Sequence, residues 1–370
     1  MNNQNRKLPD PFDSFVVGSL PRPKWVMEVV ERRKNGDISD ANFQSILDTA
    51  VPFAITLQEK AGLNYITDGE WRRESYVKVF SDSVDGFEND LIGVGTVNQD
   101  SHTTNMYPAV VNKIKQVKSI ALNEAKFTTN HSLGRSKLLV TLPSAYTVGR
   151  RMWDEKFSSA AYPDRSEFIE DCVPIIRNEI TNLMNAGFLN IQLDDPWLAL
   201  LVDPEYRKRE KISDIDKEIE LSVKSTNKIV EGFNSVFFSV HLCHAHYNRL
   251  HGSEGPYDLI AHAFSQLHID RIAIELASPV AGGLDILKTF PRDKILGMGV
   301  VDHTSKDIEK SESIVAKVEE AINYLGTDNI TLNPDCGFAP SSSNPMDLDE
   351  AYLKLKELSV ASMDLKSKYS

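Results

Sequence analysis

The chain has 370 residues, 41% of them apolar, and a formal net charge of −12 at pH 7. This acidic balance argues against nucleic acid or an anionic membrane surface as a general partner. No apolar run reaches the roughly 18 residues of a transmembrane helix, and the first residues lack the apolar segment of a signal peptide. Three cysteines in so long a chain are too few for a disulfide framework. We therefore expect a cytoplasmic protein whose cysteines bind a metal or pack in the core.

Eight short apolar runs bounded by turn residues predict strands. In chain order they cover residues 15–20, 64–68, 137–142, 190–194, 237–243, 271–276, 294–301 and 329–333. Between them apolar residues recur at helical spacing, as Phe168, Cys172 and Ile176 do. Alternating strands and helices are typical of parallel βα units, and eight units predict one α/β domain, a (β/α)8 TIM barrel that spans residues 1–370. An open doubly wound sheet is the alternative, although the chain has no glycine-rich dinucleotide fingerprint.

Residues 84–136 interrupt this alternation after the second predicted strand. They are polar and mixed, with one β-like run at 108–114 and a short predicted helix at 119–128. Chemistry in a barrel collects where strands end and loops begin. We therefore interpret the segment as an insertion over the active-site mouth and not as a separate domain.

Metal-ligating residue types follow three of the predicted strands. His241 and Cys243 lie at the end of the fifth, Glu275 at the end of the sixth, and Cys336 just after the eighth. Side chains of a strand alternate with a period of two, so His241 and Cys243 point to the same face. One histidine, two cysteines and one glutamate are ligands that suit zinc. The alternative is that each is a buried core residue, which is the role that we predict for Cys172 on its apolar helical face.

Other polar residues also fall at predicted strand ends, where scattered surface residues would have no reason to gather. They are Gly18-Ser19, Asp68-Gly69-Glu70, Asp194-Asp195 and Asp302-His303. Helix capping is the alternative for the paired aspartates, an ion pair with a nearby arginine for Glu70, and turn chemistry for Gly18-Ser19. His244 and His246 follow the fifth strand and are weaker candidates for the metal, because a loop constrains them less than a strand does.

Taken together and in this order, these motifs resemble the cobalamin-independent methionine synthase family. The resemblance is to the C-terminal catalytic barrel of that enzyme and to its shorter single-barrel relatives, and it covers nearly the whole chain. Any one of the motifs is weak, but the ordered set is specific. The supporting stretches are Val17-Gly18-Ser19, Asp68-Gly69-Glu70, Ile191-Gln192-Leu193-Asp194-Asp195-Pro196, His241-Leu242-Cys243, Ile274-Glu275 and Asn333-Pro334-Asp335-Cys336-Gly337.

The resemblance implies a zinc-dependent methyltransferase that moves a methyl group to the thiol of homocysteine and so forms methionine. It assigns the metal to His241, Cys243, Glu275 and Cys336, and the homocysteine to Ser19, Glu70 and Asp194. Zinc would lower the pKa of the substrate thiol, and Glu275 would be the labile ligand that makes room for the sulfur. Asp302 and His303 approximate the family's catalytic position after the seventh strand.

The resemblance leaves the methyl donor open between methyltetrahydrofolate and a methyl-corrinoid, either free or on a carrier protein. The tryptophan that the family places after its third strand to face the pterin has no counterpart after Thr141-Leu142-Pro143. A departing folate nitrogen needs a proton, for which His303 is the candidate general acid, whereas a corrinoid needs none. Two other functions share this architecture. One is epoxide opening by coenzyme M, as in epoxyalkane–coenzyme M transferases, and the other is a non-catalytic zinc-binding accessory role.

Overall fold

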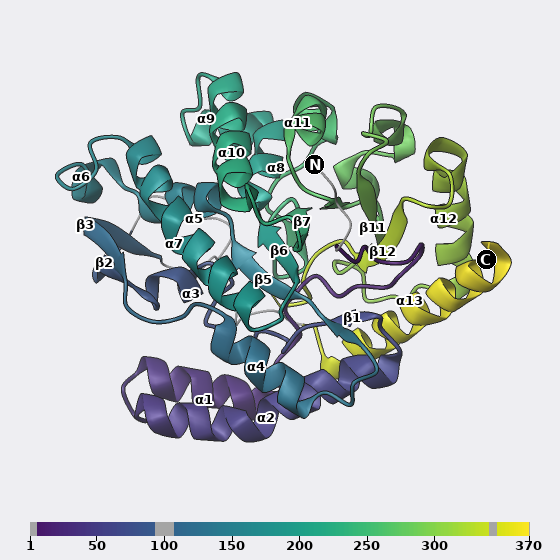
Figure 1. Cartoon of the computed structure of the whole chain (residues 1–370), viewed down its shortest axis with the longest axis horizontal. Helices are drawn as coiled ribbons and strands as arrows, with labels where there is room; N and C mark the ends of the chain where they lie inside the picture. Colours follow the sequence, from purple (N-terminus) through teal and green to yellow (C-terminus); the bar gives the residue numbers. More distant parts are fainter. Residues whose placement is uncertain (1–5, 93–106, 340–345, 370) are drawn as a thin grey trace.

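A parallel sheet forms the centre of the molecule (Figure 1). The computed structural model describes residues 6–92, 107–339 and 346–369. Six strands pair in the order β12-β11-β10-β7-β6-β5, and every pairing is parallel. Their bounds are β5 Val140–Pro143, β6 Asn190–Asp194, β7 Phe237–Leu242, β10 Arg271–Ile274, β11 Ile295–Val301 and β12 Ile330–Pro334. Nearly all of their residues are buried, as in a parallel sheet that is covered on both faces.

A second, short parallel pair consists of β1 (Tyr65–Ile66) and β4 (Lys137–Leu138). The strand predicted at 137–142 is therefore split in two, because Leu139 separates β4 from β5. The amide of Leu139 still donates to the carbonyl of Ile66 at 2.9 Å. The pairing with β1 thus continues up to the first residue of β5.

Residues 14 and 15 connect the two sets of strands by single bridges. Ser14 pairs with Leu332 of β12, and Phe15 pairs with Tyr65 of β1. Side chains from both sets also meet in one apolar cluster, separate from the main core, which contains Phe15, Tyr65, Leu139, Phe237 and Ile295. The guanidinium of buried Arg271 lies over the Phe15 ring, 4.1 Å from its centroid.

The first predicted strand, at 15–20, is wrong over most of its length. Beyond Phe15 the backbone forms no ladder in the part of the chain that the structure describes. The carbonyl of Val17 instead accepts from the Gln192 side chain at 2.7 Å, and the carbonyl of Gly18 accepts from the Thr67 hydroxyl at 2.6 Å. Side chains therefore take the acceptors that a neighbouring strand would have used.

Helices cover the sheet, and the longer ones have sequence-encoded ends. Ser39 caps α2 by accepting from Asn42, and Asp164 and Asp214 cap α7 and α10 in the same way. The longer helices are α1 Lys24–Lys34, α2 Asp40–Ala61, α7 Arg165–Asn185, α10 Ile215–Val230, α12 Ser311–Leu325 and α13 Leu348–Tyr369. Helix α13, yellow in Figure 1, packs against α2 and α12. The main core lies between these helices and the sheet.

Shorter elements occupy the connections. The short helices are α3 Lys78–Ser81, α4 Leu122–His131, α5 Ala145–Met152, α6 Glu155–Ser158, α8 Pro196–Ala199, α9 Pro204–Arg209 and α11 Ala261–Gln266. The 3₁₀ helices are η2 Leu200–Val202, η3 Tyr257–Ile260, η4 Pro279–Ala281 and η5 Leu284–Lys288. Cys172 is fully buried in the core on α7, which confirms its predicted packing role. Among the described helices, none is both long and apolar enough to cross a membrane.

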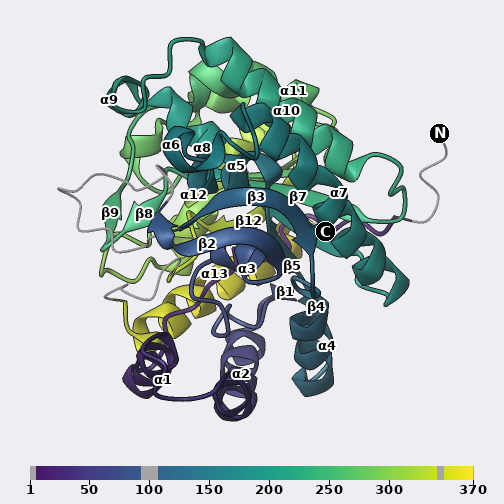
Figure 2. The same cartoon turned by 90° about the vertical axis from the view of Figure 1, so that its left-hand side faces the viewer.

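The segment predicted as an insertion contains an antiparallel pair and a helix. Strands β2 (Val84–Ile92) and β3 (Pro108–Gln116) pair with each other, and β3 packs against α5, α6 and α7 (Figure 2). The β-like run predicted at 108–114 is confirmed, whereas the helix predicted at 119–128 begins at Leu122. Residues 93–106 of the insertion lie outside the described residues.

Candidate metal centre and substrate pocket

Three donor side chains converge where β7 and β12 end. His241 lies on β7, Cys243 follows its last residue, and Cys336 follows β12 by two residues. One ligand atom from each lies within 4.8 Å of the others, and all three residues are buried. The two sulfur atoms are 3.6 Å apart, with the Cys336 thiol donating to Cys243. A histidine nitrogen and two thiol sulfurs at this spacing suit a tetrahedral metal ion.

Glu275 approaches the same place from β10. Ile274 pairs with Leu242 in the sheet register, so Glu275, one residue further, is level with Cys243. Its carboxylate forms a second donor group with Cys243 and His246, again within 4.8 Å. The four predicted ligands thus fall into two donor groups that share Cys243. Among the described residues, Glu275 is grouped with Cys243 but not with His241 or Cys336.

Asp194 orients His241 toward the thiols. Asp194 at the end of β6 pairs in register with His241 and accepts from its Nδ1 at 3.3 Å. The Gln192 amide donates to the same carboxylate at 2.8 Å and so fixes it. Within the described ranges, Nε2 of His241 is buried without a hydrogen-bond partner. A metal-ligating histidine has this arrangement, with one nitrogen on a carboxylate and the other free for the ion. The residues therefore fit a bound metal.

The electrostatics of the three donors favour a thiolate. Burial alone would raise the pKa of Cys243, but the hydrogen bond from Cys336 and the nearby His241 lower it to about 6. The same hydrogen bond is the main cause that raises the pKa of Cys336 well above its usual range, and burial is the second. Burial alone would lower the pKa of His241, but the charges of Cys243 and Asp194 raise it well above its usual value. A deprotonated cysteine is the form that binds a metal.

Asp335 connects two of the ligand-bearing segments. Its Oδ1 accepts from the backbone amides of Leu276 and Ala277 at 3.1 and 3.0 Å, so the residue before Cys336 holds the segment that follows Glu275. Gly299 on β11 makes this possible, because a Cβ there would lie 2.2 Å from Asp335 Oδ1. The motif around Cys336 contains Asp335, but the sequence pattern predicts no role for it.

Ser19 and Glu70 also lie near the donor residues. Two glycines leave the space that these side chains occupy. A Cβ on Gly18 would lie 2.8 Å from Glu70 Oε1, and one on Gly337 would lie 2.5 Å from Ser19 Oγ. The Ser19 hydroxyl accepts from the amide of Ala339 at 3.2 Å, in the segment that follows Cys336. Burial raises the pKa of Glu70, and the charge of Asp194 adds to this shift. Ser19 therefore lies beside the segment that follows Cys336, and Glu70 is within electrostatic range of Asp194, which contacts His241.

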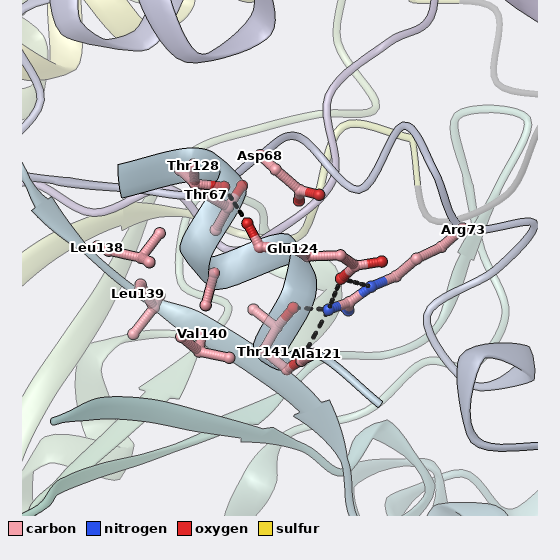
Figure 3. A pocket seen from close by; sticks show the side chains of 11 residues that line it. Thr67, Asp68, Arg73, Ala121, Glu124, Thr128, Leu138, Leu139, Val140 and Thr141 are labelled. Carbon is pink, nitrogen blue, oxygen red and sulfur yellow. Dashed lines mark hydrogen bonds and ion pairs between the residues drawn. The ribbon is translucent and has the colours of Figure 1, made fainter. Parts of the chain in front are cut away.

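Arg73 holds Glu70 in place through the ion pair that was the alternative interpretation of Glu70. Its Nη1 lies 3.2 Å from Glu70 Oε1, which also accepts from the Thr141 hydroxyl at 2.7 Å. On the far side, Arg73 forms an ion pair with Glu124 at 2.7 Å (Figure 3). Burial raises the pKa of Glu124 to about 7. Glu124 lies on α4, so the predicted insertion supports the pocket from outside.

Two of the acidic residues at strand ends accept hydrogen bonds from hydroxyl and amide groups around them. The carboxylate of Asp195 does not cap α8 but accepts from the hydroxyls of Thr147 and Ser222 at 2.9 and 2.6 Å. Asp302 accepts from both the amide and the hydroxyl of Thr304, at 2.8 and 2.6 Å. Its carboxylate therefore stabilises the loop in which it lies.

His303 belongs to a group of histidines next to Glu275. Its ring centroid is 3.6 Å from that of His246, and burial lowers its pKa to about 4. His244 donates to Glu275 Oε2 and to the carbonyl of Gly255, each at 2.9 Å, so neither of its nitrogens is free for a metal. His246 Nε2 lies 3.1 Å from Glu275 Oε1. Sequence analysis did not predict that His303 and His246 touch.

Arg151 contacts two aromatic rings from distant parts of the chain, and the sequence did not predict these contacts. The Arg151 guanidinium lies 3.9 Å from the ring centroid of Trp197 and 4.8 Å from that of Tyr107. Burial raises the pKa of Tyr76 well above its usual range, and the neighbouring Tyr107 and Cys243 add to this shift. Tyr76 therefore lies within electrostatic range of Cys243. These residues come from four separate segments of the chain, so the periodicity of apolar residues cannot predict that they meet.

Comparisons with known proteins agree with this geometry. A methionine synthase of Saccharolobus solfataricus is 29% identical over 322 residues, which is 87% of this chain and 86% of that protein. A methionine synthase of Saccharolobus islandicus is 30% identical over the same shares. The solved structure of a B12-independent methionine synthase from Shewanella sp. W3-18-1, in complex with selenomethionine, is similar in fold. Its TM-score is 0.79 at 19% identity, over 97% of this chain and 98% of that one.

A family model also matches most of the chain. It describes the catalytic domain of the cobalamin-independent synthase and matches residues 12–357. This range contains every strand of the parallel sheet and every donor side chain described above. The chain therefore belongs to the cobalamin-independent methionine synthase family, as the motifs at its strand ends predicted.

Proposed function

We propose that this protein is a zinc-dependent methyltransferase that methylates the thiol of homocysteine and releases methionine. The observation that carries the proposal is the cluster of His241, Cys243 and Cys336 with Glu275 beside it. Nitrogen and sulfur donors of this kind select zinc among the common divalent ions. His241, Cys243 and Cys336 would hold the ion, and Glu275 would complete the set until the substrate sulfur takes its place. Bound zinc supplies a Lewis acid that lowers the pKa of a thiol.

The protein's own side chains bind and orient the amino-acid part of the substrate. Asp194 and Glu70 are two buried carboxylates within electrostatic range of each other, and a substrate ammonium group is their natural partner. Ser19 offers a hydroxyl beside Cys336. Once the substrate is held, its sulfur forms the new bond to the methyl carbon. The electron pair of the broken bond stays with the donor.

The proposal includes a closed (β/α)8 barrel as the scaffold. The bridges of Ser14 to β12 and of Phe15 to β1 support closure, as does the continuation from β4 into β5. The apolar cluster of Phe15, Tyr65, Leu139, Phe237 and Ile295 would be a layer of its interior. The site then lies at the carboxyl ends of the strands, where barrel enzymes carry their chemistry. The insertion at 84–136 would cover part of this mouth.

The methyl donor is a methyltetrahydrofolate or a methyl-corrinoid, the latter either free or on a carrier protein. His303 is the candidate general acid for a folate nitrogen, and Asp302 fixes the loop that carries it. Burial lowers the pKa of His303 to about 4, so its imidazole is neutral at pH 7. The three free thiols suit a reducing cytoplasm.

The proposal is tested by measuring product formation with zinc-loaded enzyme. Homocysteine and coenzyme M are offered in parallel as acceptors, each with methyltetrahydrofolate and with a methyl-corrinoid, and methionine or methylated coenzyme M is quantified. We expect methionine from at least one donor and no methylated coenzyme M, because coenzyme M lacks the ammonium group that Asp194 and Glu70 would bind. Zinc binding without turnover of either thiol would contradict the proposal and support an accessory role.

A further inference from the structure

Arg73 lies between two carboxylates, and every one of its side-chain N–H groups is used. Its Nη1 donates to Glu70 Oε1 at 3.2 Å and to the Thr141 hydroxyl at 2.9 Å. Its Nε and Nη2 donate to Glu124 Oε2 at 2.9 and 2.7 Å, and Nη2 also donates to the carbonyl of Thr141 at 3.1 Å (Figure 3). A guanidinium has five N–H donors, so these contacts fix the group in one orientation.

Glu124 is the stronger of the two carboxylate partners. It accepts two hydrogen bonds from Arg73, whereas Glu70 accepts one longer bond. Burial alone would lower the pKa of Arg73, but the charges of Glu124 and then of Glu70 raise it above its usual value. At pH 8, above the pKa of about 7 that burial gives Glu124, Arg73 and Glu124 form a neutral pair. Arg73 can therefore hold Glu70 without neutralising its charge.

The wider network keeps one negative charge in excess. Its members interact electrostatically and comprise two arginines and three carboxylates, namely Arg22, Arg73, Asp68, Glu70 and Glu124. With all of them ionised, the excess is available to a substrate ammonium group. With Glu124 neutral, the charges of the network would cancel and its attraction for a cation would fall.

Glu70 is held by its backbone and by one of its two carboxylate oxygens. Its φ angle of 57° is uncommon for a residue other than glycine. Its amide donates to Asp68 Oδ1 at 2.8 Å, and its carbonyl accepts from Arg22 at 2.6 Å. Among the described residues, its carboxylate accepts through Oε1 alone, from Arg73 and Thr141. Oε2 therefore remains for a substrate ammonium group.

Helix α4, which carries Glu124, is fixed near both ends by buried glutamates of the main fold. Glu179 of α7 accepts from the amide of Leu122 at 2.9 Å, where α4 begins. Glu59 of α2 accepts from the amide of Leu133 at 2.9 Å, just beyond its end. The two glutamates are 0% and 4% exposed. The position of Glu124 is therefore set by α2 and α7 and does not depend on Arg73.

The space beside Glu124 is too small for homocysteine. The cavity that Asp68, Arg73 and Glu124 line there has a volume of about 10 Å³ (Figure 3), which is the space of about one water molecule. Arg73 separates Glu124 from Glu70. Any effect of Glu124 on the substrate therefore passes through Arg73.

We propose that Glu124 is a positioning residue for the amino group of the substrate. It balances the charge of Arg73, so that Arg73 fixes the carboxylate of Glu70 while Glu70 keeps its own charge for the homocysteine ammonium. The proposal rests on the proposed function for the role of Glu70. Within the described ranges, Glu124 itself has no hydrogen bond or ion pair with a metal donor.

The test compares two thiols on Glu124→Gln at pH 8. Homocysteine and 4-sulfanylbutanoate, which lacks only the amino group, are titrated by calorimetry into zinc-loaded full-length protein. We expect the affinity for homocysteine to fall roughly tenfold to hundredfold, as for a unit charge left uncompensated a few ångströms from a bound ion. The affinity for 4-sulfanylbutanoate and the zinc content should stay unchanged, which a general disturbance of the pocket would not allow.

The matched control is Asp48→Asn. Asp48 is the partner of the neighbouring Arg72 at the same distance of 2.7 Å, but its side chain is 54% exposed. This variant should bind both thiols as the unmodified protein does. Glu124→Asp is the second variant. It keeps the charge and should bind homocysteine more tightly than Glu124→Gln.

Three results would overturn the inference. They are unchanged homocysteine affinity in Glu124→Gln, an equal loss of affinity for both thiols, and equal homocysteine affinity in Glu124→Asp and Glu124→Gln. In each case the proposed function stands as long as the unmodified protein prefers homocysteine to 4-sulfanylbutanoate. If the unmodified protein shows no such preference, the proposed amino-group pocket fails and the inference fails with it.

Discussion

The two donor groups of this protein are built in different ways. His241, Cys243 and Cys336 lie on strands or directly after them, and the sheet register holds them. His246 and His251 lie on a two-stranded hairpin whose position depends on a turn and on one ion pair. Backbone ladders in a buried sheet are harder to displace than a loop. We therefore expect the strand-borne donors to hold a metal ion in fixed geometry and the hairpin histidines to be the more adjustable.

The largest effect is expected from Cys243→Ser, because Cys243 belongs to both donor groups. Zinc affinity should fall by more than the 10–100-fold that is typical of residues supporting a ligand, and methionine formation should no longer be detectable. Zinc content and activity are measured on the same samples. Cys172→Ser is the control, since that thiol lies in the core on α7. Equal zinc loss in both variants would show that misfolding, and not ligand removal, causes the effect.

Removing the support of a strand-borne ligand should cost less. Asp194→Asn weakens the hydrogen bond that orients His241 and removes one charge opposite the substrate ammonium. We expect homocysteine affinity to fall roughly 10–100-fold, the equivalent of a charged hydrogen bond of about 1.5–3 kcal/mol. Calorimetry on zinc-loaded protein measures this. Asp37→Asn, at an exposed position between α1 and α2, should bind homocysteine normally. Unchanged affinity in Asp194→Asn would remove this residue from the substrate pocket.

His303 tests which donor the enzyme uses. His303→Ala should depress a folate-dependent rate by roughly a hundredfold, as loss of a general acid does. It should change a corrinoid-dependent rate little, because cobalt leaves without a proton. Steady-state methionine formation with each donor distinguishes the two. Rapid folate turnover that survives the substitution would exclude His303 as the acid.

The smallest effect is expected at the anchor of the hairpin. Arg249→Ala breaks the ion pair with Glu350, whose side chains are 11% and 16% exposed. The free energy of unfolding should fall by about 1 kcal/mol, at the upper end for a pair near the surface. The zinc content should stay unchanged, because Arg249 contacts Glu350 and Ser305 and none of the strand-borne donors. Lys288→Ala, at an exposed ion pair with Asp285, is the control for general charge effects. Loss of zinc in Arg249→Ala but not in the control would show that the hairpin also supports the strand-borne donors.

The difference between strand-borne and loop-borne residues also explains how much of the site could be predicted from the sequence. The strand-borne donors were predicted because a period of two and a strand end fix where a side chain points. Six of the eight predicted strands correspond to strands of the main sheet, and the run at 64–68 corresponds to β1. The run at 15–20 failed because the side chains of Gln192 and Thr67 take its backbone acceptors. No local pattern encodes contacts between such distant segments.

The missed residues share this dependence on tertiary structure. His251 faces His246 only because the turn at Asn248 and Arg249 sets the register. Two histidines that flank a short turn are a signal that can be searched for in advance. Asp335 acquires its role because Gly299, on another strand, leaves room for its carboxylate. That pairing becomes visible only in the folded chain.

The most direct test of the central claim is zinc K-edge absorption of protein loaded with one equivalent of zinc, with and without homocysteine. The claim is that His241, Cys243 and Cys336 hold a zinc ion with one position open to the substrate thiol. Without substrate, the spectrum should show the two cysteine sulfurs of the cluster. With homocysteine it should gain one further sulfur and lose one oxygen or nitrogen ligand, whereas coenzyme M should leave it unchanged. A spectrum that homocysteine does not alter would contradict the claim.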